Sequence, residues 1–241
     1  MGFPWDAYKP VHAREMIKAA LVDMDGTLYD SMPFHSKAWH RLMNEIGIEA
    51  PEDEFYLDEG MTGAATVNKL AMKAWNKCFS KEECDALYAR KAAYFRELGA
   101  PGLMPGADRV IAGLMRRGIV CVLVTGSGQN SLLCRLDSDF PDAFPQCRRV
   151  TARDVSNGKP HPEPFLRGAA LAGVRPEECI AIDNAPLGVE SASRAGTVAI
   201  GVCTGPIPAY VLEKAGASIV YGSMDELADG LDVLLDSLTM L

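Results

Sequence analysis

The chain has 241 residues, enough for a sizeable hydrophobic core and for one large domain or a domain with a smaller partner. The net charge of -8 argues against a nucleic-acid partner or an anionic membrane, both of which favour a basic surface. Seven scattered cysteines without a C-x-x-C pair indicate reduced thiols, and we find neither a signal peptide nor an apolar run of membrane-spanning length. We therefore expect a cytoplasmic protein.

The first predicted element is a buried strand that ends at two carboxylates. The stretch LVDMDGTLY (21–29) is apolar up to Asp23 and Asp25, and Gly26 and Thr27 follow. Upstream, the aromatic residues Phe3, Trp5 and Tyr8 are expected to pack on the body of the protein as an N-terminal arm.

The next segment, 31–98, contains no good strand. Three helical patterns occupy 31–47, 63–79 and 80–99, with Pro33 near the first turn of the first helix. Ser80 and Glu83 have the spacing of a capping box at the start of the third helix. This pattern predicts an all-helical insert between the first strand and the rest of a sheet.

Strands and helices alternate after a Pro/Gly-rich linker at 100–107. Predicted strands lie at 119–125, 179–183, 197–202 and 217–221, and predicted helices lie at 107–117, 162–172, 187–195 and 224–238. This alternation predicts an α/β fold, a Rossmann-like parallel sheet with helices on both faces. The expected domains are a core of 1–29 and 100–241 and a helical cap of 30–99.

Polar residues gather where the predicted strands end, which is where parallel sheets bind ligands. They are Asp23, Asp25, Thr125, Gly126, Ser127, Asp183 and Asn184, and a Lys-Pro loop adds Lys159. Three carboxylates in one crevice repel one another unless a cation lies among them, and oxygen ligands favour Mg²⁺. The hydroxyls and the glycine-flanked backbone at 125–128 suit a phosphate.

Four stretches in this order resemble the motifs of the haloacid dehalogenase (HAD) superfamily: DMDGT (23–27), VTGS (124–127), GKP (158–160) and IDN…GVESASRAG (182–196). The resemblance spans roughly 18–222, and the helical insert is similar to the C1 cap of the β-phosphoglucomutase-like branch. It implies that Asp23 is a nucleophile forming an aspartyl-phosphate and that Asp25 is the general acid and base.

The resemblance also implies the ligands of the site. Mg²⁺ would be held by Asp23, the backbone carbonyl of Asp25, and Asp183, while Thr125 and Lys159 would bind phosphoryl oxygens. Many relatives carry two acids in the fourth motif, whereas Asn184 follows Asp183 here. The part that Asn184 takes in coordination is therefore open.

Several residues have a structural alternative to their functional interpretation. Ser127 is either a phosphate ligand or a helix N-cap, and His35 on the first cap helix either faces the site or does not. Most of the lysines 69, 73 and 91 are expected on the surface, and Trp39 and Trp75 are expected to fill the core of the cap.

The cap loop DEGMTGAAT (58–66) bears on the substrate, because it offers Glu59 and no cation to a second phosphate. A solvated Glu59 is the structural alternative. The whole set of motifs looks most like the HAD-type inorganic pyrophosphatases of this branch, a group often catalogued under β-phosphoglucomutase. We therefore expect a monomeric phosphohydrolase acting on pyrophosphate or a small phosphomonoester. β-Phosphoglucomutase is the alternative, and a non-catalytic phosphate-binding protein is a more remote one.

Overall fold

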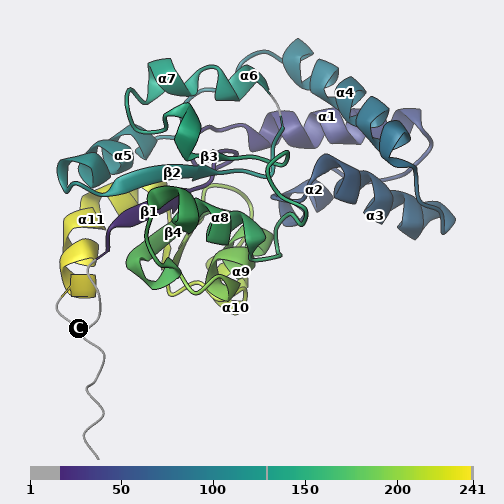
Figure 1. The fold of residues 1–241 in the computed structure, drawn as a ribbon. Helices are drawn as coiled ribbons and strands as arrows, with labels where there is room; N and C mark the ends of the chain where they lie inside the picture. Colours follow the sequence, from purple (N-terminus) through teal and green to yellow (C-terminus); the bar gives the residue numbers. More distant parts are fainter. Residues whose placement is uncertain (1–16, 129, 240–241) are drawn as a thin grey trace, which may run out of the picture.

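A six-stranded parallel sheet forms the centre of the molecule (Figure 1). The computed structural model describes residues 17–128 and 130–239, so Phe3, Trp5 and Tyr8 lie outside the described residues. The strand order is β3-β2-β1-β4-β5-β6. The strands are β1 (Ala19–Val22), β2 (Val120–Val124), β3 (Arg149–Val150), β4 (Cys179–Asp183), β5 (Val198–Val202) and β6 (Ile219–Tyr221). This sheet confirms the predicted α/β class.

Apolar side chains leave the strands on both faces of the sheet, as the short apolar runs predict. Ala20 and Val22 of β1 belong to the apolar cluster on one face, and Ala19 and Leu21 belong to the cluster on the other. The first face is covered by α5 (Ala107–Arg116) and α11 (Met224–Thr239). The second is covered by α8 (Glu163–Ala172), α9 (Pro186–Arg194) and α10 (Ala209–Lys214).

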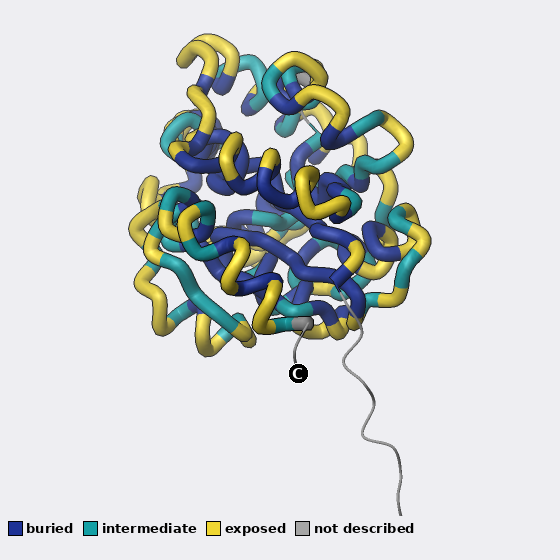
Figure 2. The backbone as a smooth tube through the Cα atoms, turned by 90° about the vertical axis from the view of Figure 1, so that its left-hand side faces the viewer, coloured by how far each residue is buried: buried dark blue, intermediate teal, exposed yellow. Residues whose placement is uncertain are grey.

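A separate helical layer, which we call the helical cap, lies beyond one end of the sheet (Figure 1). Its helices are α1 (Met32–Glu45), α2 (Glu54–Leu57), α3 (Gly63–Trp75) and α4 (Lys81–Glu97). They share an apolar cluster around Trp39, Leu42 and Leu70. Figure 2 shows buried segments running through both the sheet layer and the helical layer.

The starts of the cap helices agree with the sequence signals, but the helix predicted over 63–79 ends earlier, at Trp75, where Asn76 takes a left-handed conformation. Pro33 lies in the first turn of α1, and Ser80 and Glu83 form the predicted capping box. Trp75 was expected in the core of the cap, and this expectation is wrong, since the residue is 44% exposed. It is the last residue of α3, where its ring meets the edge of Phe79 instead of the apolar cluster.

Several short elements were not predicted. They are β3, α2, α6 (Asn130–Leu133), α7 (Leu136–Asp139), α10 and two 3₁₀ turns at Gln146–Arg148 and Pro176–Glu178. Each is too short to show a clear period in the sequence. No helix in the described part of the chain is long and apolar enough to cross a bilayer.

The chain enters and leaves the cap at one place. The backbone N–H of Asp30 donates to the carbonyl of Gly102 at 3.0 Å, and that of Met104 donates to Leu28 at 2.9 Å. Tyr29 and Leu103 form an isolated antiparallel bridge between these bonds. The two connections therefore make a short ribbon that begins a few residues after Asp25.

Candidate active site

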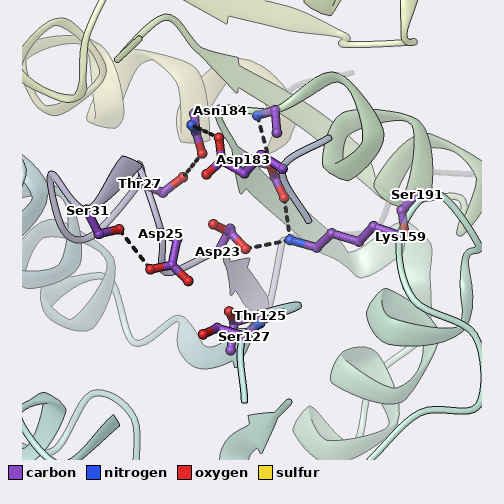
Figure 3. Close-up of polar contacts among 12 residues, drawn as sticks. Asp23, Asp25, Thr27, Ser31, Thr125, Ser127, Lys159, Asp183, Asn184 and Ser191 are labelled. Atoms are coloured by element: carbon purple, nitrogen blue, oxygen red, sulfur yellow. Dashed lines mark hydrogen bonds and ion pairs between the residues drawn. The ribbon is translucent and has the colours of Figure 1, made fainter. Parts of the chain in front are cut away.

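Asp23, Asp183 and Lys159 meet at the carboxyl end of the sheet (Figure 3). Asp23 directly follows β1, and Asp183 is the last residue of the neighbouring β4. The Lys159 ammonium donates to Asp23 Oδ1 at 2.5 Å and to Asp183 Oδ2 at 2.7 Å. All three residues are buried, so one ammonium holds two carboxylates toward a common point.

Burial and the crowding of charge perturb these groups in opposite directions. Burial, followed by the charge of Asp183, raises the pKa of Asp23 well above its usual range, although Lys159 acts against this. Burial alone would lower the pKa of Lys159, but Asp183 and Asp23 hold it above its ordinary value. The ammonium therefore stays charged, while the carboxylates carry an excess of negative charge that a further cation would relieve.

The turn after β4 fixes Asp183 and Asn184. Asp183 Oδ1 accepts the backbone N–H of Ala185 at 2.9 Å, just before α9 begins. A Cβ at Gly188 would lie 2.0 Å from Asp183 Oδ2, so the carboxylate packs directly on the helix backbone. Asn184 Oδ1 accepts from the Thr27 hydroxyl at 3.0 Å, and its Nδ2 donates to Glu59 Oε2 at 2.9 Å. The amide thus links the loop after β1 to the cap.

Asp25 is tied to the first cap helix. Its Oδ1 accepts from the Ser31 hydroxyl and from His35 Nε2, each at 2.8 Å. Lys91 Nζ contacts the other ring nitrogen, Nδ1 of His35. Because an ammonium can only donate, His35 accepts at Nδ1 and donates through Nε2. Thus His35 faces the site.

The same contacts set the charge of Asp25. Burial acts to raise the pKa of Asp25, but His35, Ser31 and Lys91 together lower it below its ordinary value. Burial and the charge of Lys91 lower the pKa of His35, and burial lowers that of Lys91 to about 7. Asp25 is therefore held as a carboxylate beside a neutral imidazole.

Thr125, Gly126 and Ser127 form the turn after β2 and line the same cavity. Thr125 Oγ1 accepts the backbone N–H of Ser127 at 3.0 Å. A Cβ at Gly126 would lie 2.4 Å from the carbonyl oxygen of Gly60 in the cap, so the two backbones touch here. The predicted phosphate loop therefore also forms part of the contact with the cap.

The cap loop closes the cavity from the opposite side. Glu59 is 9% exposed, which excludes the solvated alternative, and its neighbour Asp58 is 7% exposed. Burial first, and then the charges of Asp23, Asp183 and Asp25, raise the pKa of Glu59 well above its usual range. The cavity between the two layers has a volume of about 60 Å³.

The structure brings together every residue predicted for the site and adds others that sequence reasoning missed. Most of the three cap lysines were expected on the surface, and Lys91 is the exception, buried at 1% exposure. The sequence did contain a signal for the burial of Lys91, because this residue lies at helical spacing from Cys84, Leu87 and Phe95 in the buried stripe of α4. Lys69 and Lys73 do lie toward the surface, paired with Asp58 and Glu54. Ser31 had no comparable signal.

Comparisons with known proteins place this chain among relatives of similar sequence and fold. The family model of haloacid dehalogenase-like hydrolases matches residues 17–196. Hexitol phosphatase A of Escherichia coli is 30% identical over 77% of this chain and 82% of its own, and the validoxylamine A 7'-phosphate phosphatase of Streptomyces hygroscopicus is 32% identical over 78% and 87%. A solved structure titled "Putative beta-phosphoglucomutase from Bacteroides vulgatus" superposes with a TM-score of 0.90 at 38% identity, covering 95% of this chain and 93% of that one. The chain belongs to the haloacid dehalogenase-like hydrolase family.

Proposed function

We propose that this protein is a Mg²⁺-dependent phosphohydrolase whose substrate is inorganic pyrophosphate. The observation that carries the proposal is the buried Glu59, which reaches from the cap to Asn184 and lines the same cavity as Asp23. A family member with this arrangement has the groups for phosphoryl transfer but little room for a large leaving group.

Asp23 is the proposed nucleophile. One of its oxygens attacks phosphorus, the bond from phosphorus to the leaving phosphate breaks, and an aspartyl-phosphate forms. Lys159 and the turn at Thr125 are placed to neutralise the phosphoryl oxygens. Asp25 then takes a proton from water, whose oxygen attacks the phosphoryl group and releases Asp23. The ionised state that His35 and Ser31 favour in Asp25 suits this second step.

The residues present fit a magnesium ion. Asp23 and Asp183 converge on one point, where the Lys159 ammonium contacts both carboxylates. Within the described residues, no set of three His, Cys, Asp or Glu side chains is arranged to hold a metal. The remaining ligands would be the Asp25 carbonyl, the Asn184 amide and substrate oxygens, which Mg²⁺ accepts. When bound, the ion would polarise the phosphoryl group.

The size of the cavity supports a small leaving group. At about 10–15 Å³ for each water, a cavity of 60 Å³ holds only a handful of water molecules. The leaving group of pyrophosphate is a phosphate, which is smaller than the sugar that leaves from a hexose phosphate. The carboxylates of Asp58 and Glu59 also replace the cation that a phosphomutase needs for the second phosphate of its bisphosphate intermediate.

A phosphate-release panel tests this proposal. It should contain pyrophosphate, hexose phosphates, hexitol phosphates and phosphoglycolate, with a parallel assay for isomerisation of β-glucose 1-phosphate. We expect pyrophosphate to have a kcat/KM at least about tenfold above every monoester, a difference of about 1.4 kcal/mol in transition-state stabilisation. A dominant hexitol phosphate, or steady isomerisation without phosphate release, contradicts the proposal.

The Glu59→Ala variant tests whether Glu59 selects the substrate. Removing the carboxylate enlarges the cavity and removes a negative charge, so the ratio of kcat/KM for pyrophosphate to that for a hexose phosphate should fall by about tenfold. Glu54→Ala removes a carboxylate of α2 that pairs with Lys73 away from the cavity, and it is the matched control. Equal losses on all substrates in Glu59→Ala would speak against a role in selectivity.

A further inference from the structure

Two carboxylate oxygens of the cap are buried at the cavity without a hydrogen-bond partner among the described residues. They are Asp58 Oδ2 and Glu59 Oε1, and both residues line the cavity. The second oxygen of each group is engaged, since Asp58 Oδ1 pairs with Lys69 and Glu59 Oε2 accepts from Asn184. A buried anionic oxygen without a partner costs free energy. These oxygens therefore indicate a ligand and not packing alone.

The ligand has to bring positive charge. Lys159 is already shared by Asp23 and Asp183, and Lys91 contacts His35. Lys69 approaches Asp58 from the solvent side, with its side chain 43% exposed. Asp23, Asp58 and Glu59 line one cavity, so a pyrophosphate bound there for attack by Asp23 would bring an anion to two cap carboxylates. Such contacts are repulsive unless a cation is shared between them.

We propose that Asp58 and Glu59 receive a second divalent cation that enters with the substrate, so that the cavity binds magnesium pyrophosphate. This inference rests on the proposed function. Mg²⁺ is commonly held by one or two protein carboxylates together with substrate phosphate oxygens, and two adjacent cap carboxylates supply that number. The site needs no third protein ligand, because the diphosphate completes it.

The Asp58 side chain can be tested against a closely matched neighbour. Glu54 is the first residue of the short helix α2, and Asp58 follows its last residue. Asp58 pairs with Lys69 of α3, and Glu54 pairs with Lys73 of the same helix. Only Asp58 of the two lines the cavity. Asp58→Asn keeps the shape of the side chain and removes its charge, and Glu54→Gln makes the same change outside the cavity.

The experiment counts bound Mn²⁺ in the full chain by equilibrium dialysis with electron paramagnetic resonance. Imidodiphosphate serves as the probe, because its bridging nitrogen resists hydrolysis. We expect one Mn²⁺ per chain without the probe and two at saturating probe. Asp58→Asn should bind only one Mn²⁺ with the probe, whereas Glu54→Gln should bind two. The thermal unfolding of each variant establishes that it is folded.

Other results would overturn the inference. A single Mn²⁺ bound to the wild type with imidodiphosphate would mean that protons, and not a metal, neutralise the cap carboxylates. This result would overturn the inference even if Asp58→Asn does not fold. Two ions retained in a folded Asp58→Asn exclude Asp58 as a ligand. Pyrophosphate hydrolysis with one bound ion refutes the second site alone. Two bound ions without pyrophosphate hydrolysis refute the proposed function alone.

Discussion

Asp23 combines two properties that a nucleophile needs, a fixed position and a charge partner. Its backbone is bonded to Ile182 of the adjacent strand, and its carboxylate to Lys159. Asp23→Asn should therefore lower kcat by about 10³-fold or more, because a carboxamide cannot form the acyl-phosphate. Phosphate release measures the loss. The thermal midpoint should not fall, since Asp183 still pairs with Lys159. Near wild-type turnover in this variant would end the covalent mechanism.

Glu59 gives a pH dependence with a definite sign. Burial and the charge of Asp23 raise its pKa in the folded state above 4.5. The folded protein therefore binds this proton more tightly than the unfolded chain does. The folded state is therefore favoured at low pH. Its free energy of unfolding falls as the pH rises from the unfolded-state pKa of Glu59 toward the raised folded-state pKa.

Glu59→Gln should remove that loss of stability. In metal-free protein near pH 7.5 we expect the midpoint of thermal unfolding to rise by about 2–4 °C, which corresponds to about 1 kcal/mol for a chain of this size. Near pH 4 the variant and the wild type should unfold at the same temperature. The same difference in unfolding temperature at both pH values would mean that the surroundings of Glu59 do not raise its pKa.

At the scale of elements, the backbone of the turn after β2 lies directly against the backbone of the cap loop. Gly126→Ala would place a methyl group 2.4 Å from the Gly60 carbonyl, whereas at Gly128 the nearest atom lies 3.9 Å away. We expect Gly126→Ala to lower kcat/KM by about 10²-fold, because the cap cannot approach the turn, and to leave the unfolding temperature nearly unchanged. Gly128→Ala should retain activity. Equal activities in the two variants would contradict this contact.

The elements also show how far sequence reasoning reaches. The long periodic segments and the motif residues at strand ends could be predicted, because strands buried on both faces and parallel edges leave a clear pattern. The contacts of Lys91 and Asp58 could not, since a lysine on a helix or an acid in a loop is ordinarily solvated. What makes them unusual is burial against the other layer, which depends on how the two layers meet. The domain boundaries stay a prediction.

At the scale of the molecule, the excess of buried carboxylates predicts a dependence on divalent cations. A chelator should abolish phosphate release, and added Mg²⁺ should restore it. A second readout does not need turnover: Mg²⁺ with phosphate at about 100 times its Kd should stabilise the protein by about 2.7 kcal/mol, measured by thermal unfolding. Full activity after exhaustive chelation would exclude the metal. The expected monomer is tested by light scattering at working concentration.

The ribbon formed by Asp30, Gly102 and their neighbours has a consequence for how such proteins diversify. The inserted helices start and finish at adjacent points and have an apolar cluster of their own, and only a few of their side chains, such as Ala38 and Phe95, also pack in the cluster on the sheet. A different lid could be grafted between these two positions without rearranging the strands beneath. Under the proposed function, chemistry and choice of leaving group are carried by separable stretches of one gene, so that each can change while the other is conserved.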